Sequence, residues 1–532
     1  MANIIVSPDN KIAKLKEGKT LLSYLQELET NIHARCGGRG TCKGCIVKVS
    51  ANKNLSSLTE IEKKAIQRKG FRLACQAKIT KEDEDIFIEI PLYTKFKILE
   101  RGKVKRIPLN PFIKKMPTSL GERIFWEKRE IGAYDGEIYG LALDIGTTTL
   151  SMVWIDLEKG NELFVSSMLN PQFRYGDNII DRINYAKIGR QKHLERAIRE
   201  GVNEMIKEVP LDSEKIYELV IVGNTAMRDI FVGNSVEKLG ESPFEPITLK
   251  PVNKIANELN LVLNPKANVY AFPLIGHFVG ADALGAILAT EIHTKTEISM
   301  MIDIGTNTEI ALGNKDGIVV TSCASGPAFE GSGIKCGIGA VEGAIQMIDI
   351  TENLEINYNT INNAPPIGIC GSGLIDILAN MLERKIIDWT GKFIKDSKKF
   401  VISEKNKIFL DGEDIDNLKL AKAAISVGAK FVSRDLNIEI DDIKKLYLAG
   451  AFGTYINREN ALKIGLLPNI PLERIEKVGN AAMEGARQAL ISKEKRREAE
   501  EIPKKIRHIR LEMEKDFHDR FVEELCFEKY RP

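Results

Sequence analysis

The sequence lacks the features that are typical of membrane proteins and nucleic-acid-binding proteins. It contains no uninterrupted apolar run near the ~18 residues that suggest a membrane-spanning helix. Positive and negative charges almost cancel, at a formal net charge of +2, so nothing favours a nucleic acid or an anionic membrane as partner. The first twenty residues also lack the apolar core of a signal peptide. We therefore expect a cytoplasmic protein that binds neither nucleic acid nor membrane.

Cysteine is scarce, with eight residues among 532. In a reducing compartment cysteines are more often metal ligands or inert thiols than disulfides. Four of the eight lie within the first 75 residues. A chain of this length is too long for one hydrophobic core, and we expect three or four domains. The other four cysteines have no CxxC spacing and are expected to be buried thiols: Cys323, Cys336, Cys370 and Cys526.

The amino-terminal cysteines have the arrangement of an iron–sulfur ligand set. Cys36, Cys42 and Cys45 lie in one glycine-rich loop, HARCGGRGTCKGC, and Cys75 follows in FRLACQA. A 2Fe-2S cluster takes four thiolates, and glycines let backbone N–H groups approach its sulfurs. The alternative is a structural zinc site. Zinc sites usually show two CxxC pairs, whereas only Cys42 and Cys45 form one here, so the pattern favours the cluster.

The segments around these cysteines have the periodicity of a small β-rich domain. Residues 4–15 alternate about a turn, TLLSYLQELE has helical spacing, and CIVKVS, FRLACQA and DIFIEI are typical of strands. Together with the cysteine loop they resemble the β-grasp fold of 2Fe-2S ferredoxins. The basic, irregular segment 93–137 then indicates a partly docked linker, although its apolar residues leave a small packed subdomain as an alternative.

A DIGT motif occurs twice in the rest of the chain. LALDIGTTTLSMVWIDLEKGN begins at Leu141 and MMIDIGTNTEIALGNKDG begins at Met300, and both are typical of a buried strand, a turn, a second strand and another turn. Two copies predict two lobes that face each other. The sequence has no GxxxxGK[ST] motif, so a phosphate site here would be of another kind.

Each DIGT turn contains residue types that bind phosphate and a metal ion. An aspartate at a strand end can hold Mg²⁺ directly or through water. A glycine admits phosphate close to the backbone, and the hydroxyl and N–H groups that follow can surround its oxygens. The candidates are Asp144, Gly146, Thr147 and Thr148 in the first copy and Asp303, Gly305, Thr306 and Asn307 in the second.

Glycine-rich segments supply the remaining candidates. LYLAGAFG, residues 446–453, predicts a strand followed by small residues against which a flat base can lie, with Gly450 and Gly453 beside it. In GICGSGLID, Gly371 and Ser372 are candidates for contact with a ligand, since such loops line ligand sites in α/β folds. Close packing of glycine against a neighbouring element is an equal alternative for these loops.

The three motifs, in this order, resemble the superfamily of acetate kinase, sugar kinases, heat-shock ATPases and actin, whose duplicated ribonuclease-H-like lobes close on ATP. A ferredoxin joined to this ATPase, with the further motifs NPQFRYGDNIIDRI, GNTAM, GADALGA, SGPAFEG and DFHDRFVEELCF, closely resembles the reductive activators of corrinoid proteins. The resemblance implies an α/β multidomain chain. Its expected parts are a β-grasp ferredoxin at 1–92, a linker at 93–137, and actin/Hsp70-type ATPase lobes at 138–297 and 298–532.

The resemblance also implies a function. One electron passes from the 2Fe-2S cluster to the Co(II) form of a corrinoid protein of a methyltransferase system, which restores Co(I). The implied cofactors besides the cluster are ATP and Mg²⁺, and a low-potential donor supplies the electron. A homodimer is left open. The family pattern assigns both DIGT turns to phosphate and metal and LAGAFG to adenosine, so Asp144 and Asp303 act on Mg·ATP. Asp282 or Glu309 is a candidate for positioning the attacking water, with a structural carboxylate as the alternative for each.

Two other functions fit the same features. The first is an ATP-driven donor to another low-potential acceptor, as in the activators of 2-hydroxyacyl-CoA dehydratases, although their shared 4Fe-4S cluster differs from the ferredoxin loop here. The second is a redox-sensing module that reports nucleotide state without turnover, against which the intact Asp144 and Asp303 argue. The chain departs from well-known family members in one respect: only about 45 residues are available for the extra domain that they carry before the ATPase. The charged segment SKEKRREAEEIPKKIRHIRLEMEKDF predicts a solvated helix and a last strand.

Overall fold

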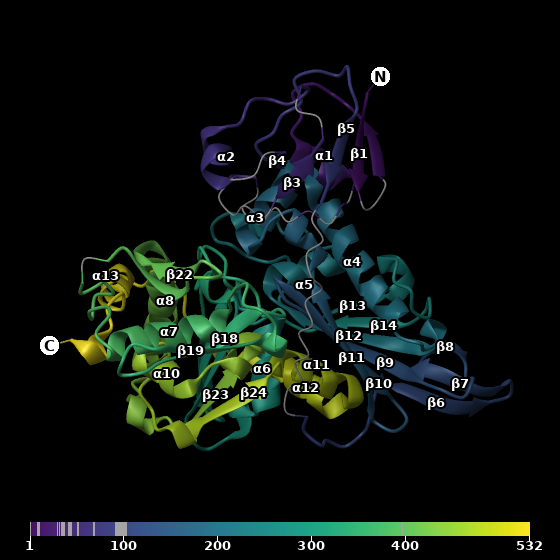
Figure 1. Cartoon of the computed structure of the whole chain (residues 1–532). Helices are drawn as coiled ribbons and strands as arrows, with labels where there is room; N and C mark the ends of the chain where they lie inside the picture. The colour runs from purple at the N-terminus through teal and green to yellow at the C-terminus, as the bar shows by residue number, and fades with distance from the viewer. Residues whose placement is uncertain are drawn as a thin grey trace.

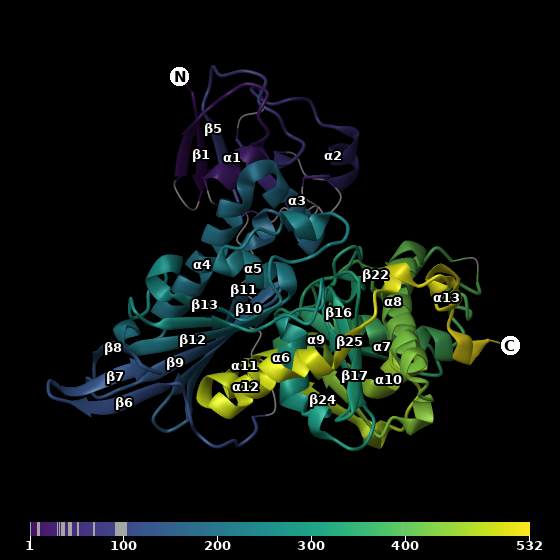
Figure 2. The same cartoon turned by 180° about the vertical axis from the view of Figure 1, so that it is seen from behind.

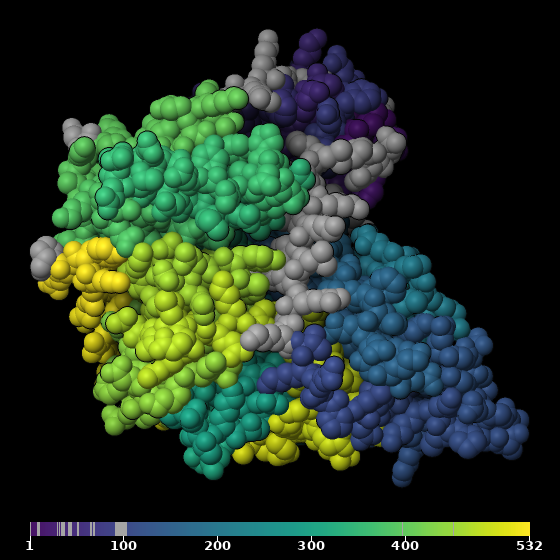
Figure 3. Space-filling view, turned by 60° about the horizontal axis from the view of Figure 1, so that its bottom comes forward, coloured from purple at the N-terminus to yellow at the C-terminus, as the bar shows by residue number. Residues whose placement is uncertain are grey.

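The computed structural model describes residues 2–7, 11–28, 30, 32, 38–40, 45–50, 53–66, 70–90, 104–395 and 397–531. An amino-terminal domain lies at one end and is followed by two larger lobes (Figure 1). In the space-filling view most of the second lobe, green to yellow, lies on one side, and the blue residues that precede the first lobe lie on the other (Figure 3). Among the described residues we find no helix with the length and apolar character that a membrane crossing requires.

The amino-terminal domain is built on a five-stranded sheet of order β2-β1-β5-β3-β4. Strands β1 and β5 pair in parallel and the other pairs are antiparallel, which is the β-grasp arrangement that we expected. Alternate residues of β1, Ile4 and Val6, are fully buried, as a two-residue period predicts. The bounds are β1 Asn3–Ser7, β2 Lys11–Lys14, α1 Leu21–Glu27, β3 Ile46–Val49, α2 Glu60–Ala65, β4 Phe71–Leu73 and β5 Ile86–Glu89.

The first lobe contains a six-stranded sheet of order β11-β10-β9-β12-β14-β13. Strand β9 is apolar from Gly140 to Leu143 because both of its faces are covered. Leu141 and Leu143 belong to the core beneath α4 and α5, whereas Ala142 belongs to the core beneath α6 and α11. The bounds are β9 Tyr139–Ile145, β10 Thr149–Asp156, β11 Glu162–Leu169, α3 Ile179–Tyr185, α4 Gln191–Glu208, β12 Ile216–Gly223, α5 Thr225–Val232, β13 Val252–Ile255, β14 Asn268–Ala271 and α6 Ala281–Thr290.

The second lobe repeats this plan in a sheet of order β24-β23-β15-β16-β17-β25. Strands β15, β16 and β17 are antiparallel and β23 runs parallel to β15, just as β9, β10, β11 and β12 do in the first lobe. The duplication predicted from the DIGT motifs is therefore confirmed. Strand β25 extends the sheet beside β17 (Figure 2). The bounds are β15 Ser299–Ile304, β16 Thr308–Asn314, β17 Gly317–Cys323, β23 Lys445–Ala449, β24 Ile475–Gly479 and β25 Ile506–His508.

Helices and two small sheets complete the second lobe. Cys323 and Cys370 are buried here as expected, whereas Cys336 and Cys526 are partly exposed. The helices are α7 Gly371–Glu383, α8 Gly412–Leu436, α9 Gly450–Tyr455, α10 Arg458–Lys463, α11 Ala481–Ile491, α12 Lys493–Glu501 and α13 Phe517–Glu523. The strands are β18 Ala344–Ile350, β19 Ile356–Thr360 and β20 Gly368–Ile369 in one sheet and β21 Lys399–Ser403 and β22 Ile408–Asp411 in the other.

Part of the segment that we expected to be a linker is folded. Strands β6 Ile113–Thr118, β7 Gly121–Trp126 and β8 Arg129–Ala133 form a three-stranded antiparallel sheet. Ile124 is fully buried, and the Trp126 indole donates to the Glu218 carboxylate at 3.0 Å. The apolar residues of this segment thus pack against the first lobe, while its many exposed basic residues conceal the strand pattern in the sequence.

The two lobes interlock through the carboxyl-terminal part of the chain. Helix α11 packs on α6 and against β9 and β12, so a helix from the carboxyl-terminal part of the chain covers the sheet of the first lobe. Helix α12 is not fully solvated, contrary to our expectation. Arg496 is 2% exposed because its guanidinium pairs with Glu218 at 2.8 Å and lies over the rings of Phe112 and Tyr270.

Candidate nucleotide and iron–sulfur sites

The two DIGT turns meet where β9 and β15 end, at the carboxyl edges of the two sheets. The Thr148 and Thr306 hydroxyl oxygens lie 3.3 Å apart. The carboxylate of Glu330 accepts hydrogen bonds from both hydroxyls, at 3.0 and 2.8 Å. Two candidate residues that are 158 positions apart in sequence are therefore brought into one site.

The first turn is held by donors from several elements. Asn224 is the N-cap of α5 and Asn480 is the N-cap of α11, so two helices begin at this turn. Arg182, on α3, is fully buried. The hydrogen bonds run from Asn480 to the Asp144 carboxylate at 2.7 Å, from Asn170 to the Gly146 carbonyl at 2.8 Å, from Asn224 to the Thr147 hydroxyl at 3.1 Å and from Arg182 to the Thr147 carbonyl at 2.6 Å.

The second turn has different neighbours. The Ser325 hydroxyl donates to the Gly305 carbonyl at 3.1 Å, and the Gly326 N–H donates to the Thr306 carbonyl at 2.9 Å. Gly450, at the start of α9, has a φ of +86°, and a Cβ at this position would lie 2.5 Å from a carboxylate oxygen of Asp303. The LAGAFG motif therefore packs directly on the second aspartate, in a conformation that favours glycine.

Three of the four candidate carboxylates have raised pKa values. Burial raises the pKa of Asp144 to about 6, against a stabilising hydrogen bond from Asn480. Burial, with the nearby charge of Asp144, raises the pKa of Asp282 to about 7. The pKa of Glu309 is raised well above its usual range by burial and by Asp282 and Asp303. A site of this kind favours either protons or a bound cation.

The geometry indicates how a cation would have to bind. In the described part of the chain, no three His, Cys, Asp or Glu side chains form a group that could hold a metal ion by themselves. Mg²⁺ usually keeps several waters and takes one or two carboxylates together with substrate phosphates. The residues present fit that mode of binding, in which the nucleotide completes the coordination.

Several glycine candidates lie in close packing instead of facing open space. A Cβ on Gly371 would lie 2.0 Å from the Phe329 carbonyl oxygen and 2.3 Å from the Phe452 ring. Phe329 and Phe452 themselves stack at 5.4 Å between ring centroids. A Cβ on Gly453 would meet the Leu448 side chain at 3.0 Å. The Ser372 hydroxyl donates to the Gln346 carbonyl at 2.7 Å, so the packing alternative describes this helix start.

The amino-terminal domain places two of the four candidate cysteines close together. Cys45 precedes β3 and Cys75 follows β4, two paired antiparallel strands, and both residues are buried. The Gln76 side chain donates to the Gly38 carbonyl at 3.3 Å and to the Cys75 sulfur at 3.6 Å, so the glycine loop lies against Cys75. Cys36 and Cys42 lie outside the described residues. Two thiols at neighbouring strand ends, with loop backbone beside them, fit a 2Fe-2S cluster.

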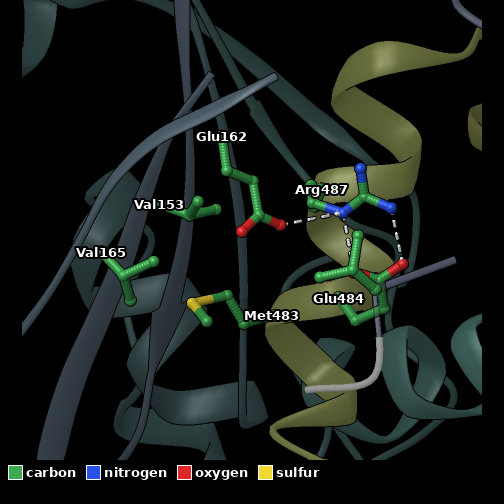
Figure 4. Close-up of a pocket in the computed structure, with 7 residues that line it drawn as sticks. Val153, Glu162, Val165, Met483, Glu484 and Arg487 are labelled. Atoms are coloured by element: carbon green, nitrogen blue, oxygen red, sulfur yellow. Dashed lines mark hydrogen bonds and ion pairs between the residues drawn. The ribbon is translucent and has the colours of Figure 1, made fainter. Parts of the chain in front are cut away.

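A small cavity lies between α11 and the strands of the first lobe (Figure 4). Its volume of about 10 Å³ is close to the minimum for one water molecule. In its wall Arg487 of α11 pairs with Glu484 at 2.7 Å and donates to the Lys105 carbonyl at 2.7 Å. At this cavity the segment that follows the amino-terminal domain, at Val104 and Lys105, is therefore bound to α11. It is lined by Val104, Val153, Glu162, Val165, Met483, Glu484 and Arg487.

Sequence analysis missed five side chains that hold the DIGT turns in place. Their contacts join distant parts of the chain, and no local spacing predicts such contacts. A weaker signal was present, since four of the five stand in motifs that we noted without assigning a role: NPQFRYGDNIIDRI, GNTAM and SGPAFEG. The missed residues are Asn170, Arg182, Asn224, Glu330 and Asn480.

The fold and the sites define a class: a 2Fe-2S ferredoxin joined to a two-lobed ATPase of the actin and heat-shock type. Three family models match the chain. They are the 2Fe-2S iron-sulfur cluster binding domain over residues 4–80, the RACo middle region over 139–295, and the C-terminal domain of RACo, the ASKHA domain, over 297–531.

Individual proteins agree with this class. The corrinoid activation enzyme RamQ of Eubacterium limosum is 36% identical over 420 residues, which cover 73% of this chain and 70% of that protein. The [Co(II) methylated amine-specific corrinoid protein] reductase of Methanosarcina barkeri is 27% identical, over 73% of this chain and 77% of its own. A solved structure of a reductive activator for corrinoid, iron-sulfur protein matches at a TM-score of 0.72 and 31% identity, over 99% of this chain and 98% of that one. The chain therefore belongs to the family of reductive activators of corrinoid proteins.

Proposed function

We propose that the chain is an ATP-dependent corrinoid protein reductase, which passes one electron to the Co(II) form of a corrinoid protein and restores Co(I). The observation that carries this proposal is the meeting of Thr148, Thr306 and Glu330, because it joins both lobes at one candidate phosphate site in a chain that also carries the cysteine loop. The 2Fe-2S cluster, when bound, supplies the electron. Family membership supports both halves of the proposal.

The energetics explain why such a reductase needs an ATPase. A gap of about 240 mV disfavours a one-electron transfer about 10⁴-fold, since about 59 mV corresponds to a factor of ten. A ferredoxin near about −400 mV cannot sustain transfer to a more negative acceptor without help. In this chain, closure of the two lobes on ATP is the step that would drive the unfavourable electron transfer.

We assign the individual residues as follows. Asp144 and Asp303 act on Mg·ATP, and either Asp282 or Glu309 positions the attacking water. Gly450 and Gly453 lie on the adenosine side, where α9 begins. The phosphates contact Gly146, Thr147, Thr148, Gly305, Thr306 and Asn307, and Gly371 and Ser372 support this wall through packing.

The remaining partners belong to the same proposal. A corrinoid protein of a methyltransferase system accepts the electron, a low-potential donor reduces the cluster, and Cys36, Cys42, Cys45 and Cys75 ligate it. The cysteine usage supports a cytoplasmic setting, where thiols stay reduced. Pairing of two copies would be tested by the mass of the purified protein in solution.

The decisive experiment measures cobalt reduction and phosphate release in one anaerobic sample. A purified Co(II) corrinoid protein is mixed with the full chain and a chemical donor, with and without ATP. We expect ATP to raise the Co(I) yield, and Asp303→Ala to keep its cluster but deliver few electrons to cobalt. An equal Co(I) yield with and without ATP, at matched donor potential, would contradict the proposal and favour the redox-sensing module.

A further inference from the structure

The cysteine loop contacts the first ATPase lobe directly. Arg39, which stands between Cys36 and Cys42 in sequence, pairs with Asp181 of α3 at 3.2 Å. Nearby, the Gln26 side chain donates to the Arg174 carbonyl at 2.5 Å. Helix α3 lies immediately below the amino-terminal domain in both views of the fold (Figures 1 and 2). The loop expected to hold the cluster is thus docked on one short helix.

Asp181 is fixed in position by its own helix. Asn178, the N-cap of α3, accepts from the Asp181 N–H at 2.9 Å and donates to the Asp181 carboxylate at 3.0 Å. Gly176 lies so close that a Cβ there would meet the Asp181 Cβ at 2.6 Å. The Asp181 side chain is 10% exposed and that of Arg39 is 63% exposed. The Asp181 carboxylate is therefore held in place before the ion pair forms, whereas the Arg39 side chain is largely exposed to solvent.

The next residue, Arg182, contacts the nucleotide site. Its guanidinium is fully buried and donates to the Thr147 carbonyl at 2.6 Å, the Gly176 carbonyl at 3.0 Å and the Gln172 side chain at 3.1 Å. These acceptors are neutral. The nearby carboxylates of Asp177 and Asp181 favour the charged guanidinium, but burial outweighs them and lowers the pKa of Arg182 to about 9. Phosphate bound at the first DIGT turn would bring negative charge to this cation.

We propose that α3 couples the nucleotide site to the docking of the ferredoxin domain, with Arg182 as the contact to the phosphate turn and Asp181 as the contact to the cysteine loop. The proposal rests on the proposed function only in that the DIGT turns bind nucleotide. Phosphate fixes Arg182 and with it the start of α3, so Asp181 holds Arg39 more firmly. Because coupling of binding is reciprocal, a docked ferredoxin domain also raises nucleotide affinity.

The test uses the full chain with its cluster and no corrinoid protein. Affinity for a non-hydrolysable ATP analogue is measured by calorimetry for Arg39→Glu, Asp181→Arg and the double exchange Arg39→Glu/Asp181→Arg. Lys48→Glu, which breaks the exposed pair with Glu89 in the same domain, is the matched control for charge. We expect each single exchange at the interface to weaken nucleotide binding about two- to fivefold, the size typical of exposed ion pairs. We expect the double exchange to restore binding and the control to leave it unchanged.

A second variant tests the route of the coupling. In an Arg182→Lys background the exchange Arg39→Glu should no longer change nucleotide affinity, since the link to Thr147 is altered. The analogue should also slow amide exchange in residues 38–40 and 174–185 of the parent chain. Unchanged affinity in both single exchanges, no recovery in the double exchange, or a full Arg39→Glu effect in the Arg182→Lys background would overturn the proposal. None of these outcomes depends on cobalt reduction, so the proposed function is judged separately.

Discussion

The two DIGT turns have the same four-residue sequence and the same strand–turn–strand backbone, but different groups hold them in place. The first turn is held by a buried guanidinium, that of Arg182, and by three amide side chains. The second turn is held by the Ser325 hydroxyl and the Gly326 N–H, and Glu330 accepts hydrogen bonds from Thr306 here and from Thr148 of the first turn. Burial, together with Asp282 and Asp303, raises the pKa of Glu309. Duplication therefore gave the two turns one backbone geometry, whereas the side chains that hold each turn are its own, and substitutions can test the two turns separately.

The largest effect should come from the carboxylate of the second turn. We expect Asp303→Asn to lower the kcat of ATP hydrolysis about 10²–10³-fold, because it removes charge from the developing metal–phosphate centre. The melting temperature and the iron content should stay close to those of the parent. Phosphate release, calorimetry and iron analysis measure the three quantities. Full ATPase activity in this variant would remove Asp303 from the site.

A substitution at Gly450 tests the second DIGT turn, because the backbone of Gly450 packs against Asp303. An alanine there would adopt an unfavourable φ and place a Cβ 2.5 Å from Asp303 and 2.8 Å from the Ile304 carbonyl. We expect Gly450→Ala to cost about 1–3 kcal/mol of unfolding free energy and to lower ATPase activity at least about tenfold. Gly136→Ala is the matched control, because its φ of +82° is similar but no atom lies within 4 Å. Equal effects of the two variants on activity would mean that strain alone, and not contact with Asp303, is responsible.

The sequence predicted the strands and turns around the two DIGT motifs better than it predicted the side chains that contact those turns. DIGT and LAGAFG have local signatures, namely an apolar run, a small turn and a second run, and these became β9, β15 and β23 as expected. The donors to the turns come from distant positions: Asn480 is 336 residues from Asp144. Arg496 was expected in solvent because charge runs usually are, yet its partner Glu218 is 278 residues away. Local periodicity carries no information about such pairs.

The raised pKa values of the site carboxylates predict that the stability of the protein depends on pH. Asp144 and Asp282 have folded-state pKa values of about 6 and about 7, above the usual value of about 3.9 for an aspartate. The folded state then binds protons that the unfolded state has released, so stability falls as pH rises from about 4 to about 7. We expect nucleotide-free protein to melt at a higher temperature at pH 6 than at pH 8, and Asp282→Asn to reduce this difference. An unchanged slope in Asp282→Asn would assign the dependence to other groups.

The smallest effect should come from the amide that supports the first turn. Asn480 caps α11 and donates to Asp144, so Asn480→Ala removes both a helix cap and the bond that lowers the pKa of Asp144. Asn457→Ala is the matched control, because Asn457 caps α10 through the N–H groups of Glu459 and Asn460.

Loss of a cap costs about 0.5–2 kcal/mol, and we expect both variants to lose stability in this range. Only Asn480→Ala should alter the acid limb of kcat/KM for ATP, which reports groups of the free enzyme. The limb should move to higher pH, because the Asp144 carboxylate loses a hydrogen bond that favours its ionised form. A fall in activity of about 1.5- to 2-fold near pH 6, with little change near pH 8, is about what a shift of a few tenths of a pH unit produces. If the two variants have the same pH profile, Asn480 supports α11 alone, and the first turn depends for its charge on Arg182.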